Sequence, residues 1–258
     1  MKDDYVEIME SGTDLLLKAI KPHLEAIKKN LIAQTMYNYE LYTDEEKYLA
    51  TDGLDYPAEL YKKFTTDLEE VMAIIALEAI TDAMDEVVIS VVTLAEPTLP
   101  TSFKRRLAKQ STLLADTTIA DLTKQVSLAY SMNWKVGPGV SDIMAESADA
   151  YIDSVLVGRG MSVLSAELVN ESRFDVFQSP EGDKQVTAWQ FYNPDPVTNI
   201  CSELNGQIFS EDDPNFENFS PPLHYNCKST YLPIRELGPD EEVGELTASS
   251  AAQDEIQF

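Results

Sequence analysis

Apolar residues recur every three or four positions along most of the chain up to Arg173, which predicts a largely helical N-terminal part. From Asp3 to Met36 they keep to one helix face, and Pro22 predicts either a kink or two consecutive helices. A second helix is predicted from about Pro57 to Leu94. It becomes apolar on most sides, so other helices must cover it. A third is predicted from Asp116 to Met132.

The helical pattern resumes after Gly137-Pro138-Gly139, which we interpret as a boundary between domains. Ser141 and Asp142 predict a helix N-cap. The helix that follows carries four polar residues at spacings of eight, three and three, namely Arg159, Glu167, Asn170 and Arg173. Residues three apart are neighbours on a helix face. One interpretation is a catalytic Glu and Arg. The other, which we favour, is a buried polar network that docks the helix onto the following sheet.

From Gln185 the apolar period changes to two, and β-branched and aromatic residues become frequent. Short strands are predicted over residues 186–192, 206–209 and 230–234. The fold class is therefore α+β, with a predominantly helical N-terminal part, a small C-terminal domain of mixed helix and short strand, and an acidic tail. The domains are expected to be 1–138, 139–237 and 238–258. The last segment has six acids and no basic residue, so we expect it to be mobile or to order on a partner.

Charge narrows the classes of function. The chain has 258 residues, a formal charge of −26 and a pI of about 4.2, so it should repel DNA and anionic membranes. The apolar stretch from Val71 to Val92 contains four carboxylates, which a lipid core would not accommodate without partners. We therefore expect no membrane segment. The N-terminus lacks a signal peptide pattern and two cysteines make no secreted disulfide framework, so synthesis in a reducing cytoplasm is expected.

Both cysteines and one of the two histidines lie between Trp189 and Ile234, as Cys201, His224 and Cys227. They form a candidate metal site, in which a structural zinc would take a fourth ligand from Asp195, Asp212, Asp213 or water. A second interpretation makes Cys227 a nucleophile with His224 as base. The third, which we favour, treats both thiols as small buried apolar groups. With no phosphate loop, serine elbow or HExxH motif, we expect neither an enzyme nor a required cofactor.

The order of motifs in this region resembles the Mu F-like minor head proteins of tailed phages, the phage head morphogenesis family. That family has Trp, Asp, Cys-x-x-Cys, Leu-x-Gly-x-x-Phe and Pro-Pro-x-His-Pro-x-Cys-Arg-Cys in succession, after a helix with Arg, Glu, Asn and Arg. The matching positions, besides the four helix residues above, are Trp189, Asp195, Cys201, Leu204, Gly206, Phe209, Pro221, Pro222, His224 and Cys227.

The sequence departs from the family pattern at four positions. Thr198 stands at the first cysteine, Ser229 at the last, Tyr225 at a proline and Lys228 at an arginine. The two missing cysteines are lost together, as expected of residues that act as a pair.

The resemblance implies a minor head protein that joins the portal vertex during procapsid assembly, stays in the virion head and assists DNA packaging or delivery. Its partners would be the portal protein and other head proteins, without sequence-specific nucleic acid. The alternative is a zinc-dependent or thiol enzyme, such as a toxin, on a phage structural module.

Overall fold

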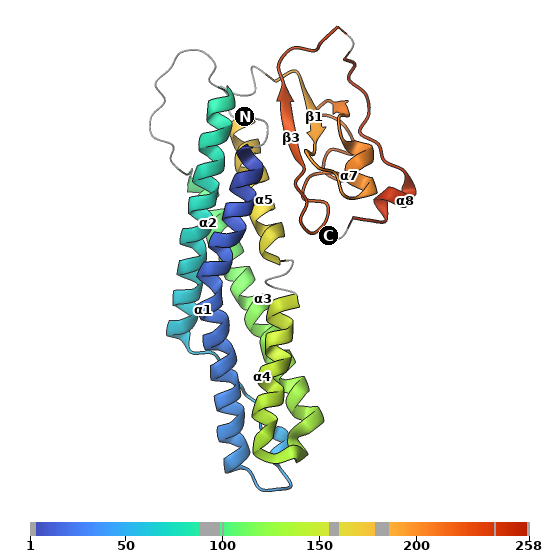
Figure 1. The fold of residues 1–258 in the computed structure, drawn as a ribbon. Coiled ribbons are helices and arrows are strands. Elements are labelled where there is room, and N and C mark those ends of the chain that lie inside the picture. The colour runs from blue at the N-terminus through green and yellow to red at the C-terminus, as the bar shows by residue number, and fades with distance from the viewer. Residues whose placement is uncertain are drawn as a thin grey trace. The chain divides into compact units, whose positions relative to one another are not determined.

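The computed structural model describes residues 4–87, 99, 101–154, 160–178, 186–239 and 241–256. Long helices make up most of it, and one small three-stranded antiparallel sheet follows in the C-terminal part (Figure 1). The predicted α+β class is confirmed. No helix in this described part combines the length and the apolarity that a bilayer crossing requires.

The first and third long helices extend further than the sequence pattern predicts. Helix α1 is a single element from Asp4 to Leu41 with Pro22 inside it, because buried Ile20 and Leu24 anchor it on both sides of the proline. After the short 3-10 helix η1 (Lys47–Leu49), α2 spans Ala58–Val87, and the predicted extension to Leu94 lies outside the described residues. Helix α3 (Thr101–Asn133) begins well before Asp116.

The Gly137-Pro138-Gly139 break is a turn between two packed helices. It lies in the 3-10 helix η2 (Trp134–Gly139), where Gly137 has a φ of 82°, and leads directly into α4 (Val140–Tyr151). The predicted N-cap at Ser141 and Asp142 is wrong, because the 3-10 turn makes both residues helical and Gly139 is the N-cap. Helix α5 spans Met161–Phe177.

The contacts divide the chain into two units. The helical unit consists of Leu15–Val71 and Pro100–Gly158, and the sheet unit of Met1–Asp14, Met72–Leu99 and Arg159–Phe258. This grouping does not follow the expected boundary near residue 138, because α3 and α4 on either side of that turn pack against each other.

The sheet unit has the strand order β2-β1-β3, with β1 (Ala188–Tyr192) between β2 (Ile208–Phe209) and β3 (Thr230–Ile234). Trp189 pairs with Phe209 on one side and with Pro233 on the other. All three strands lie where the period of two predicts them. The short helix α7 (Asn199–Leu204) connects β1 to β2.

The segment after Leu237, expected to be mobile, is packed into the sheet unit. Leu246 and Ala252 are 0% and 1% exposed, and Ala252 belongs to the short helix α8 (Ser250–Gln253). The Leu246 N–H donates to the Asp213 carboxylate at 2.8 Å. The expectation of mobility is therefore corrected: a few apolar residues spaced among the acids fill gaps in the core, and their burial offsets the cost of ordering the segment.

Candidate cysteine-histidine site

Two elements of the sheet unit carry the candidate site. Cys201 lies in the first turn of α7, where the Thr198 side chain caps the helix by accepting from the Cys201 N–H. His224 and Cys227 lie in the loop before β3, which turns at Asn226 with a φ of 59°. The left-handed conformation is tolerated by asparagine better than by most residues, and it brings Cys227 back toward the helix.

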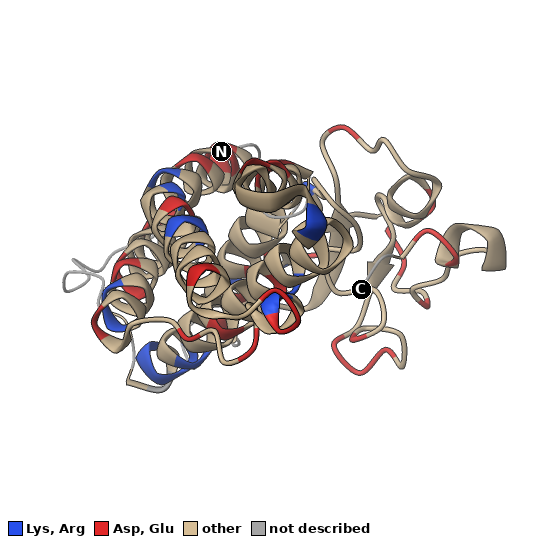
Figure 2. Ribbon diagram, turned by 90° about the horizontal axis from the view of Figure 1, so that it is seen from below, with Lys and Arg blue, Asp and Glu red and all other residues tan. Residues whose placement is uncertain are grey.

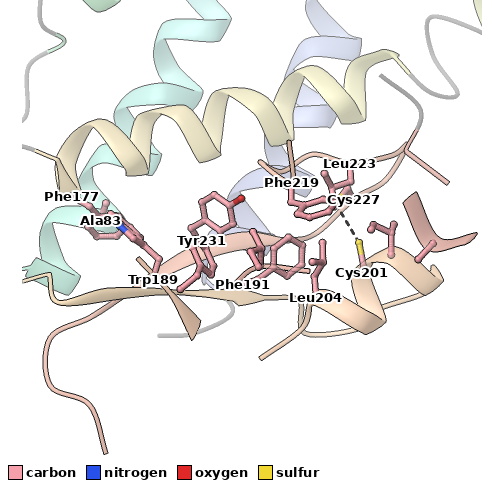
Figure 3. Close-up of a cluster of buried hydrophobic side chains, with 14 residues drawn as sticks. Ala83, Phe177, Trp189, Phe191, Cys201, Leu204, Phe219, Leu223, Cys227 and Tyr231 are labelled. Atoms are coloured by element: carbon pink, nitrogen blue, oxygen red, sulfur yellow. Dashed lines mark hydrogen bonds between the residues drawn. The ribbon is translucent and has the colours of Figure 1, made fainter. Parts of the chain in front are cut away.

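The three side chains converge in a buried cluster. Cys201 Sγ lies 3.0 Å from His224 Nε2 and 3.8 Å from Cys227 Sγ, a contact drawn as a dashed line in Figure 3. The Nε2 and sulfur atoms all lie within 4.8 Å of one another, and the residues are 0%, 3% and 3% exposed. The sequence spacing alone did not require this convergence, since 22 residues separate Cys201 from His224.

The tautomer of His224 follows from its other contact. Nδ1 lies 2.8 Å from the backbone oxygen of Tyr225, and because a carbonyl oxygen only accepts, Nδ1 carries the proton. The Nε2 lone pair of the neutral ring therefore points toward Cys201.

Thr198 and Ser229 belong to the same cluster. Thr198 Oγ1 lies 3.0 Å from His224 Nε2, and Ser229 Oγ lies 3.3 Å from Cys201 Sγ. At these two positions the family pattern has cysteines. The two cysteines that this chain lacks would therefore lie around the same site. Asn193, the residue that follows β1, donates from Nδ2 to Ser229 Oγ at 2.8 Å and is 3% exposed.

The pKa values of the two thiols are shifted in opposite directions. The hydrogen bond between the two thiols lowers the pKa of Cys227 and raises that of Cys201. The hydrogen bond with Cys201 raises the pKa of the His224 imidazole.

The alternative interpretation, with Cys227 as nucleophile and His224 as base, finds no hydrogen bond between these two side chains among the described residues. The His224 ring faces Cys201 and Thr198, and both sulfurs are buried, whereas a nucleophilic thiol must reach a substrate. Among the described residues no carboxylate joins the metal-ligating cluster. Asp213 accepts from the N–H groups of Leu246 and Asn215, and Asp195 is exposed, so neither is the expected fourth zinc ligand.

The polar residues of α5 act in packing. Arg173 is 1% exposed, forms an ion pair with Asp82 of α2 and lies over the rings of Tyr5 and Phe177. Asn170 Nδ2 donates to the backbone oxygen of Ser229 at 3.1 Å, just before β3. Asn170 therefore connects α5 to the residue before β3, whereas the ion pair of Arg173 is with α2. Arg159 lies outside the described residues.

The aromatic and aliphatic motif residues form the core beside the site. Trp189, Leu204 and Phe209 are buried together with both cysteines. Figure 3 labels Trp189, Leu204 and the two cysteines in this cluster. Gly206 has a φ of 88°, which a side chain would disfavour. Pro221 and Pro222 are joined by a cis peptide bond in the loop that leads to His224.

Comparisons with protein-family models, with curated proteins and with solved structures find no match for this chain.

Proposed function

We propose that this chain is a structural minor head protein of a tailed phage, associated with the portal and procapsid, and that it assists head assembly, DNA packaging or DNA delivery. One observation carries the proposal. The residues on which the Mu F-like resemblance depends are separated in sequence, yet Trp189, Cys201, Leu204, Phe209 and Cys227 share one buried cluster. A functional motif made of core residues favours a role in contact and assembly over a role in catalysis.

The Cys-His cluster also favours this function over a thiol or zinc enzyme. Its sulfurs are buried, and His224 faces Cys201 instead of the proposed nucleophile Cys227. Such an arrangement suits the stabilisation of a small domain.

An apolar surface at one end of the helical unit supplies a site for a protein partner. Its large side chains are 55–75% exposed and come from the ends of α1 and α3 and from η1 and η2: Tyr37, Leu41, Tyr48, Met132 and Val136. These segments meet directly, because Tyr130 of α3 donates to the backbone oxygen of Lys47 and Lys47 Nζ lies 4.6 Å from the Tyr39 ring centre. We call these five residues the apolar end.

Acidic residues are frequent in the segment that leaves α1, which carries Tyr48 of the apolar end. Residues 40–59 contain one base, Lys47, and seven acids. The acids are Glu40, Asp44, Glu45, Glu46, Asp52, Asp55 and Glu59. Figure 2 is drawn from below the view of Figure 1 and marks the acidic positions in red. A partner with an apolar patch and basic neighbours would complement this surface, and the portal protein encoded by the same phage genome is the occupant we propose.

The test is incorporation into heads. We expect Leu41→Glu to reduce the amount of this protein in purified procapsids severalfold, because a buried interface does not accept an unpaired carboxylate. The matched control is Leu113→Glu, since both leucines are 63% exposed but Leu113 lies in the middle of α3. Incorporation would be measured by quantitative mass spectrometry of procapsids assembled with each variant. Absence of the wild-type protein from procapsids would overturn the function, and equal loss for both variants would overturn the proposed surface.

A further inference from the structure

We propose that Cys201, His224 and Cys227 bind one zinc ion and that the fourth coordination position adjoins the hydroxyl of Ser229. This inference goes beyond the proposed function and does not depend on it. It rests on the geometry of the donor atoms, on the orientation of the histidine ring and on the place of Ser229.

The sulfur atoms are already spaced for a tetrahedral ion. Two thiolates each about 2.3 Å from zinc in a tetrahedron lie about 3.8 Å apart. Cys201 Sγ and Cys227 Sγ are 3.8 Å apart. A thiolate and an imidazole nitrogen on the same ion lie about 3.6 Å apart, so the 3.0 Å between Cys201 Sγ and His224 Nε2 must lengthen slightly as zinc enters.

The His224 ring is held in the orientation that a metal ligand requires. Its Nδ1–H donates to the Tyr225 carbonyl, so Nε2 is left with a lone pair directed at the cluster. A histidine that ligates zinc generally donates its other N–H to a carbonyl or carboxylate in this way, which fixes both tautomer and ring direction.

Ser229 contacts both thiols of the cluster. It is 0% exposed, its Oγ is 3.3 Å from Cys201 Sγ, and it also hydrogen-bonds Cys227. Asn193 Nδ2 donates to the same oxygen and holds it in place. Thr198, the other hydroxyl of the cluster, already caps α7. The ion would thus join α7 to the segment before β3, with two thiolates and an imidazole as strong ligands and a neutral hydroxyl or a water at the fourth position.

A gain of a ligand provides the sharpest test, because it does not depend on a variant that loses stability. Ser229→Cys should complete a Cys3His site and raise zinc affinity about tenfold or more. The matched control is Ser202→Cys, which adds a thiol at an exposed position of α7. Affinity would be measured on the reduced full-length protein by competition with a chromophoric zinc chelator, and Co²⁺ would be added in place of zinc to detect thiolate coordination by its charge-transfer absorption.

We expect about one zinc per wild-type chain, loss of that zinc in Cys201→Ser with helical circular dichroism retained, and tighter binding only in Ser229→Cys. Wild-type protein that takes up neither zinc nor Co²⁺ when reduced would overturn the site. Uptake that survives Cys201→Ser would do the same. Equal affinities for Ser229→Cys and Ser202→Cys would overturn the assignment of the fourth position.

Discussion

Side chains of one chemical type serve different purposes in this protein because their surroundings differ. Arg173 is buried against Asp82 and two aromatic rings, whereas the basic run near the start of α3 includes exposed Lys104 and Arg105. Glu40 is exposed at the end of α1, while burial raises the pKa of Glu167 on α5 above its ordinary value of 4.5. The position of a charged residue in the fold therefore determines whether it stabilises or strains the native state.

The raised pKa of Glu167 predicts how the stability of the protein depends on pH. Since its pKa is higher in the folded protein, the native state favours the protonated form. The stabilisation is complete below the unfolded pKa and is lost as pH rises through the folded pKa. Glu167→Gln, which cannot ionise, should therefore be more stable than wild type at pH 7, and its advantage should shrink toward pH 4.5.

Urea unfolding at several pH values measures this effect. Glu40→Gln is the matched control, because it changes the net charge equally at an exposed site. Parallel stability curves for the two variants would show that global charge, and not the burial of Glu167, is responsible.

Among the elements, the C-terminal segment shows how a few apolar residues can order an acidic sequence. Leu246 lies in the core, Gly244 bridges to Phe209, and Ser249 caps α8 by accepting from the Ala252 N–H. Ser249 also contacts Glu203 of α7 through its N–H and its hydroxyl. The segment thus covers one side of the small sheet unit and becomes part of its core.

Leu246→Ala should destabilise the protein by about 2–5 kcal/mol, the usual cost of removing a buried leucine side chain. Val243→Ala is the control, since Val243 is 44% exposed and lies three residues away. Thermal and chemical unfolding of both variants would measure the difference. If both substitutions had negligible effect, the segment would not be packed in solution.

At the scale of the whole molecule, charge predicts which partners the chain avoids. Most of the formal charge of −26 lies in the sheet unit, and the C-terminal part in Figure 2 shows mainly acidic positions. A field of this sign repels phosphate backbones and attracts basic protein surfaces. It is compatible with the proposed contacts to other proteins.

The isolated full-length chain should therefore not be retained by duplex DNA at about 0.15 M salt. Fluorescence anisotropy with a labelled duplex measures this, over a series of salt concentrations. Binding that weakens steeply as salt rises would indicate phosphate contacts, and it would mean that the basic run from Lys104 to Lys109 outweighs the global charge.

The sequence by itself predicted the fold class, the three strands and the absence of a membrane-crossing helix in the described part. Apolar periodicity is local information, and burying an apolar face is the main reason these elements form. Five of the motif residues named from the resemblance share one buried core: Trp189, Cys201, Leu204, Phe209 and Cys227.

Only the tertiary structure decided where the elements end and what they contact. Local turn chemistry suggested a domain boundary at Gly137-Pro138-Gly139, but α3 and α4 pack across it. Composition suggested a mobile tail, but Leu246 of this segment is buried in the core. The cluster of Cys201, His224, Cys227 and Ser229 depends on a loop that returns to α7, and such long-range contacts leave no periodic signal in the sequence. They arise from packing between segments that are distant along the chain, which no local pattern encodes.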